Sequence, residues 1–113
     1  MTHDLLGSEI HVADAASVVA VDDFVGGFIA CEARVVNILG AAEHDDSVIV
    51  QACAAAIHLF AESPAGPVNA RPHLARAAAS TVPASERERC FARAVQAWCD
   101  DEVGRAIGLL EAL

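Results

Sequence analysis

His58 and Glu62 are the first pair whose residue types and spacing could support chemistry, because they lie four positions apart in a segment with helical periodicity. Residues at this spacing share a helix face, so the imidazole and the carboxylate can exchange a proton. Such a pair is typical of a general base or a ligand contact. The plainer interpretation is an exposed His–Glu pair, and the sequence predicts no catalytic residue.

The cysteines are the remaining candidate nucleophiles, at Cys31, Cys53, Cys90 and Cys99. They show no CxxC spacing and lie within helical patterns, so we predict reduced thiols. Cys31 and Cys53 fall on apolar helix faces, where cysteine packs as a small hydrophobe. Cys99 precedes the last predicted helix, whose dipole would lower the thiol pKa while Asp100 and Asp101 would raise it.

Metal and cofactor motifs are missing from the sequence. A zinc site needs Cys and His at close spacing, whereas the five histidines are scattered, at His3, His11, His44, His58 and His73. The chain also has no GxGxxG, no GxxxxGK followed by Ser or Thr, and no GxSxG. We therefore predict neither a metal nor a cofactor.

A polar stripe is the best candidate for a recognition surface. Arg89, Arg93 and Gln96 recur at helical spacing on the side opposite an apolar face. Together with His58, these residues are the predicted partner-binding set. The alternative is a solvated helix face on which the charges support one another.

Composition limits the choice of partners. The chain has 113 residues, 55% of them hydrophobic, with a net charge of −9 and no lysine. This length fits one domain, residues 1–113, with residues 1–12 as a candidate mobile N-terminus. An acidic chain repels nucleic acid and anionic membranes, so we expect neither as a partner.

Localisation is expected to be cytoplasmic. The first residues lack the apolar run of a secretory signal. The longest uncharged stretch, residues 47–61, is shorter than the roughly 18 residues that a membrane-spanning helix needs.

Helical periodicity runs through nearly the whole chain, and strands have little support. We predict an all-α fold of antiparallel helical hairpins, either a tetratricopeptide-like helical repeat or a compact bundle. The predicted helices span residues 13–29, 31–43, 47–62, 70–80, 85 to about 100, and 102–113.

Local signals place several helix ends. Ser85 and Glu88 form a capping box at the start of the fifth helix. Asp46 or Ser47 is expected to cap the third helix, and Pro72 is expected in the first turn of the fourth. Gly26-Gly27 is expected to weaken the end of the first helix. The wetter side of the third helix is predicted to carry Gln51, Ala55, His58 and Glu62.

The last thirty or so residues resemble the first repeat region of the tetratricopeptide repeat protein thirty-eight family, in residues 85–88, Phe91, Ala94, 100–101 and 105–113. Residues 24–43 and 46–59 are similar to the N-terminal helices of that family more loosely. The resemblance implies a helical-repeat scaffold or binding surface and carries no catalytic position. Two features depart from the family: Asp100-Asp101 occupies a turn where glycine is usual, and the downstream repeats are missing.

The last predicted helix is apolar almost all round near its end, at Ile107, Leu109, Leu110 and Leu113. Either the chain is the N-terminal piece of a longer protein, or another chain covers these residues. We predict an interaction or scaffold domain that binds a protein or peptide partner, or forms a homo-oligomer through this helix.

The alternative prediction is a small subunit or N-terminal portion of a larger enzyme, with a pocket between the third and fifth helices. His58, Arg93 and a thiol around a cavity there would favour this alternative. Alanine and valine packing at that interface would favour the scaffold.

Overall fold

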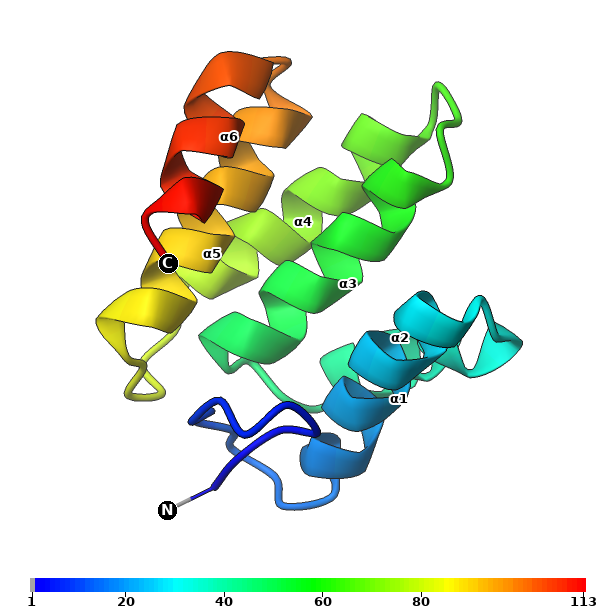
Figure 1. Cartoon of the computed structure of the whole chain (residues 1–113), viewed down its shortest axis with the longest axis vertical. Coiled ribbons are helices and arrows are strands. Elements are labelled where there is room, and N and C mark those ends of the chain that lie inside the picture. Colours follow the sequence, from blue (N-terminus) through cyan, green and yellow to red (C-terminus); the bar gives the residue numbers. More distant parts are fainter. Residues whose placement is uncertain (1) are drawn as a thin grey trace.

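Three helical hairpins account for most of the computed structural model, which describes residues 2–113 (Figure 1). The described part of the chain contains six α helices, one 3-10 turn (η1), and an isolated bridge between His3 and Glu9 in place of any strand. The all-α prediction is confirmed. The elements are α1 (Ser17–Ala30), η1 (Ala33–Val36), α2 (Asn37–Ala42), α3 (Val48–Phe60), α4 (Gly66–Ala79), α5 (Glu86–Cys99) and α6 (Val103–Glu111).

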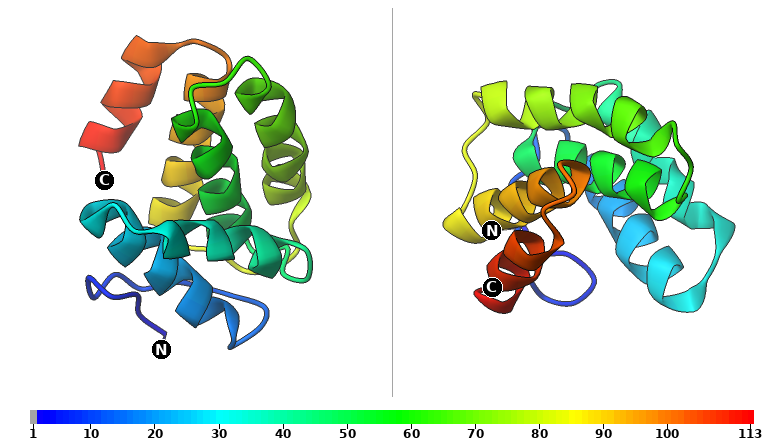
Figure 2. Two further views of the ribbon diagram at one scale, coloured as in Figure 1. Left: turned by 90° about the vertical axis from the view of Figure 1, so that its right-hand side faces the viewer. Right: turned by 90° about the horizontal axis from the view of Figure 1, so that it is seen from above.

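Helix α3 lies at the centre of the molecule and packs against α1, α2, α4 and α5 (Figure 1). Helix α6 packs on α5, and the α1–α2 pair crosses one end of the α3–α4 hairpin (Figure 2). The radius of gyration is 12.7 Å, close to the value of about 13 Å expected for a compact chain of this length. The helices therefore form a compact globule.

The central place of α3 overturns the prediction of a wetter side on this helix. Gln51 and Ala55 are both fully buried, because α1, α2, α4 and α5 all pack on α3. The buried Gln51 amide makes hydrogen bonds to the protein in place of those it would make to water: its Nε2 donates to the carbonyl oxygens of Ala42 (2.9 Å) and Asp45 (2.7 Å). His58 is half-buried and only Glu62 is exposed, just beyond the helix end.

The segment after α1 also differs from the prediction of a continuous helix over residues 31–43. Cys31 adopts a left-handed conformation with φ 57° and ends α1, so it is exposed rather than part of an apolar face. A Cβ on Gly27 would lie 2.9 Å from the backbone nitrogen of Val35. The glycine pair thus lets η1 pack directly on α1, which explains Gly26-Gly27 better than a weakened helix end does.

Helix α4 begins four residues earlier than predicted, at Gly66. Pro67 occupies its first turn, where a missing N–H costs nothing. Pro72 instead lies in the helix interior, which corrects its predicted place. The capping box of α5 is confirmed: the backbone N–H of Glu88 donates to Oγ of Ser85 (3.1 Å), and that of Ser85 donates to Oε1 of Glu88 (2.9 Å).

A buried carboxylate, that of Asp45, joins the α2–α3 turn to the start of α1. Its oxygens accept hydrogen bonds from the backbone N–H groups of Ala13, Asp14 and Ser47 and from the hydroxyl of Ser17 (2.7 Å). Ser47 occupies the N-cap position of α3 without making a side-chain cap, so the predicted cap by Asp46 or Ser47 is wrong. The first helix therefore begins at Ser17 and not at residue 13 as predicted, since the Asp45 carboxylate accepts the N–H groups of Ala13 and Asp14.

The pKa of the Asp45 carboxyl reflects this environment. Burial raises the pKa, but hydrogen bonds from Ser17, Asp14 and Ser47 favour the ionised form and outweigh it. The pKa therefore lies below its ordinary value of 3.8.

A second buried carboxylate holds the N-terminal segment. Glu88 accepts hydrogen bonds from the backbone N–H of His11 (2.9 Å) and from its ring Nδ1 (2.5 Å), which places Ile10 in the core. The backbone N–H of Leu5 donates to Asp22 on α1 (2.7 Å). The segment thus packs against both α1 and α5, while the single-domain division and the mobility of residues 1–12 stay predictions.

Replacing Asp45 with Asn is expected to lower the free energy of unfolding by about 3 kcal/mol, because the amide turns donor hydrogens toward the donors that the carboxylate now satisfies. Urea denaturation at neutral pH measures this change. The matched control, Asp46→Asn, loses only an exposed ion pair with Arg76 and should cost less than about 1 kcal/mol. Equal losses in the two variants would contradict the role of Asp45.

The loss of folding stability at acidic pH should also depend on Asp45. A carboxyl whose pKa is lower in the folded than in the unfolded chain stabilises the fold above its unfolded pKa, and this stabilisation is lost as the pH falls toward the folded pKa. Between about pH 4 and pH 2 the unchanged chain should therefore lose stability faster than the Asp45→Asn variant. Thermal unfolding curves that shift in parallel over this range would rule out the lowered pKa.

Candidate functional site

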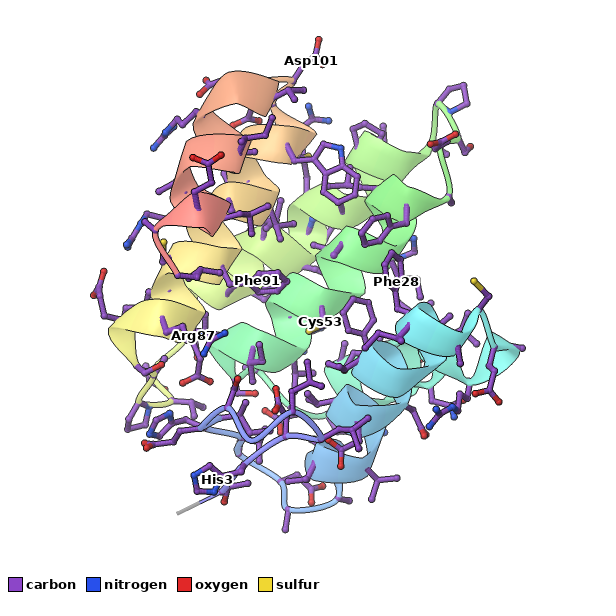
Figure 3. The ribbon with its side chains drawn as sticks, in the orientation of Figure 1. His3, Phe28, Cys53, Arg87, Phe91 and Asp101 are labelled. Carbon is purple, nitrogen blue, oxygen red and sulfur yellow. The ribbon has the colours of Figure 1, made fainter. Side chains whose placement is uncertain are left out.

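An apolar groove of about 340 Å³ opens between α1 and α3 on one side and α5 and α6 on the other. Small side chains form its floor, at Ala56, Ala94, Val95 and Ala106. Figure 3 shows Phe28 of α1 and Phe91 of α5 on opposite sides of the central helix. Because the floor side chains are short, the groove keeps its depth although α1 and α5 both pack on α3.

Every aromatic side chain of Phe and Trp in this chain lines the groove, at Phe24, Phe28, Phe60, Phe91 and Trp98. Four of them form a continuous series. Ring centroids lie 6.3 Å apart for Phe24 and Phe28, 4.3 Å for Phe28 and Phe60, and 4.7 Å for Phe60 and Trp98. These distances are typical of favourable aromatic pairs.

The groove is open to solvent despite its aromatic wall. Phe28 is 46% exposed and Phe60 44% exposed, and across the groove Ile107 of α6 is 50% exposed. Large apolar side chains gathered at one opening are typical of an interaction site rather than of an ordinary monomer surface. Phe28 and Phe60 lie at the helical spacing typical of core residues. The gathering of the aromatic side chains at one opening becomes visible only in the fold.

The predicted self-association residues divide between two places. Ile107 and Leu110 line the apolar groove, and Leu113 lines a smaller pocket next to it. Leu109 is half-buried on the side of α6 that packs on α5, where the thiol of Cys90 donates to its carbonyl oxygen (3.3 Å). Leu109 is therefore the member of this set least available to a partner.

The predicted partner-binding residues also separate. Arg89, Arg93 and Gln96 line a shallow groove of about 230 Å³ between α4 and α5. An ion pair with Glu86 (2.7 Å) holds Arg93, and the Gln96 amide donates to Asp100 (3.1 Å). The two pairs support the interpretation of a solvated helix face, while a role in partner binding stays a prediction.

His58 lies apart from that groove and stacks on His73 of α4, with ring centroids 5.5 Å apart. Since Nε2 of Gln51 donates to two carbonyls, its Oε1 must accept, so Nδ1 of His73 donates to it (2.8 Å). Burial, followed by the nearby His58 and Arg76, lowers the pKa of His73. The imidazole of His73 thus belongs to a hydrogen-bond network with the buried Gln51. Between residues 2 and 113 no ion pair joins His58 to Glu62.

The interface between α3 and α5 consists of small apolar side chains, among them Ala56, Ala94 and Val95. A cavity does border both helices, but His58 faces α4, and Arg93 lines the separate groove between α4 and α5. His58 and Arg93 therefore do not meet at one cavity, as the enzyme alternative requires. Within residues 2–113 no group of three or more His, Cys, Asp or Glu side chains is arranged to hold a metal ion.

The thiols differ in accessibility. Cys31 is exposed, Cys90 is half-buried, and Cys53 and Cys99 are buried. Burial raises the pKa of the Cys53 thiol, and Asp4 adds to the shift. Burial also raises the pKa of Cys99, with Asp100 adding to it against an opposing effect of Arg71. A reactive Cys99 is thus disfavoured, because burial opposes the thiolate form.

Comparison with protein-family models, curated proteins and solved structures finds no match for this chain. The resemblance of residues 85–113 to a tetratricopeptide family therefore stays a prediction. Among the helices of residues 2–113, none has both the length and the apolar character required to cross a membrane.

Iodoacetamide is expected to label Cys31 first under native conditions, and Cys53 and Cys99 at least about tenfold more slowly, because alkylation of a buried thiol requires local opening. Peptide mass spectrometry over a time course gives the four rates separately. Labelling in urea is the control, since unfolding should bring the rates together. Native labelling of Cys99 as fast as Cys31 would show that the thiol is accessible and activated.

Proposed function

We propose that this chain is a helical interaction domain that binds an amphipathic helix of a protein partner in the groove between α1, α3, α5 and α6. One observation carries the proposal: all five Phe and Trp side chains line this one opening. Aromatic residues dominate the binding energy of protein interfaces. An amphipathic helix offers an apolar stripe that matches an apolar groove.

The dimensions of the groove support a helix as its occupant. From Phe91 to Trp98 the wall formed by α5 runs for about 10 Å, at 1.5 Å per residue. A stretch of about two turns of a partner helix spans this length and presents three or four apolar side chains on one face. The resemblance to tetratricopeptide proteins, which also implies a binding surface, is consistent with this proposal.

Trp98 gives a direct test, because it is the only tryptophan of the chain and lines the groove. The probe is a synthetic peptide of about 18 residues with leucines at i, i+3, i+4 and i+7 in its middle, the rest Ala, Gln and Ser, and no aromatic residue. Titration should shift the Trp98 fluorescence in a saturable way. The variant Ile107→Ser should weaken binding by about tenfold, since it removes roughly half of an isoleucine side chain from the contact.

Ile29→Ser is the matched control. Ile29 is 67% exposed, more than Ile107, and it does not line the groove. The same substitution there should leave peptide binding unchanged. Absence of saturable binding to the unchanged chain, or equal weakening by the two variants, would overturn the proposed function.

Light scattering behind size-exclusion chromatography separates the partner helix from a second copy of this chain. A monomer at both low and high protein concentration is expected, because each copy carries a net charge of −9. A dimer that Ile107→Ser converts to monomer would place a second copy in the groove and contradict a foreign helix as the occupant.

A further inference from the structure

Charged side chains lie at the two ends of the apolar groove and not along it. No charged residue is among those that line the groove itself within the described part of the chain. Past Trp98 and Val103, which line both cavities, the groove continues into an open notch that is lined by Glu62 and Asp101. Both carboxylates are exposed, and neither has an ion pair within residues 2–113.

The opposite end of the groove is also acidic. Past Phe24 and Phe91 it continues into a pocket of about 200 Å³ whose charged lining residues are Asp4, Glu9, Glu88 and Arg87. Three carboxylates lie there with one guanidinium, and the imidazole of His11 contacts Glu9 (3.1 Å) and Glu88 (2.5 Å). Figure 3 shows Asp101 and Arg87 beyond the two ends of the apolar stretch, with Phe91 between them.

Carboxylates outnumber arginines at these ends, where Arg87 lines the pocket and Arg71 lies near the Cys99 thiol of the notch. Four of the seven arginines pair with carboxylates elsewhere on the surface, at Arg34, Arg76, Arg93 and Arg105. With a net charge of −9, the chain leaves a negative potential at both ends of an uncharged groove. A second copy would bring the same negative charge to this site, which disfavours it as the occupant.

Resting on the proposed function, we propose that the partner helix is cationic: its apolar stripe lies in the groove, and lysine or arginine side chains at both ends of the stripe face the carboxylates. One end faces Glu62 and Asp101, and the other faces Asp4 and Glu9. Complementary charge of this kind speeds association and fixes the register of a helix whose apolar contacts alone tolerate several registers.

Two peptides with one apolar face test the charge. Both keep the leucines of the uncharged probe, and they differ only at the two residues on each end of the stripe, which are lysine in one peptide and glutamate in the other. At low salt the lysine peptide should bind about tenfold more tightly than the glutamate peptide, measured by Trp98 fluorescence. The difference should shrink as the salt concentration approaches about 0.5 M, because salt screens exposed charges.

A double variant locates the effect. Glu62→Gln with Asp101→Asn removes the two carboxylates of the notch and should reduce the preference for the lysine peptide severalfold. The uncharged probe should bind this variant as it binds the unchanged chain. The matched control is Asp14→Asn with Glu43→Gln, which removes the same charge from exposed positions that line neither the groove nor its ends.

The outcomes separate this inference from the proposed function. If the uncharged, lysine and glutamate peptides bind equally, or the glutamate peptide binds best, the cationic partner is overturned and the helix-binding groove stands. The control double variant could reduce the preference for the lysine peptide as much as the notch variant does. In that case the net charge of the chain, and not the carboxylates at the ends of the groove, explains the preference, and the inference fails. If none of the three peptides binds, both proposals fail.

Discussion

Burial of the Asp45 carboxylate is the constraint on which the arrangement of α1 depends. An ionised group out of water must be surrounded by donors, and here the donors come from residues 13–17 and from Ser47. The requirement fixes the start of α1 against the α2–α3 turn. Since α1 carries Phe24 and Phe28, the same carboxylate also sets the position of one wall of the apolar groove.

The groove exists because two hairpins pack on α3 without meeting each other closely. Helix α1 packs on α3 and on the segment that follows it, whereas α6 packs on α5. Short side chains such as Ala56 and Ala94 lie between the two walls, so the space above them is not filled. Large side chains at these positions would have closed the opening and produced an ordinary core.

Periodicity and local chemistry were enough to predict six helices in their order, because each helix has its own apolar face and α5 has its own capping box, but not where α1, α2 and α4 begin. They were not enough for Gln51 or Asp45, whose burial depends on contacts with helices distant in sequence. The sequence indicated an apolar set at Ile107, Leu109, Leu110 and Leu113, of which Ile107 and Leu110 form one side of the groove. It did not indicate the opposite side, since Phe28 has the spacing of a core residue and only the packing of α1 leaves it half-exposed.

Net charge and the apolar groove are connected through solubility and choice of partner. An exposed aromatic and aliphatic opening promotes association between copies, and a charge of −9 on each copy opposes it at long range. The electrostatic repulsion is strongest when the approaching surface is equally acidic, and it becomes attraction when that surface is basic. The acidic composition that disfavours nucleic acid thus also favours one class of occupant for the groove: a helix whose apolar face lies between cationic ends.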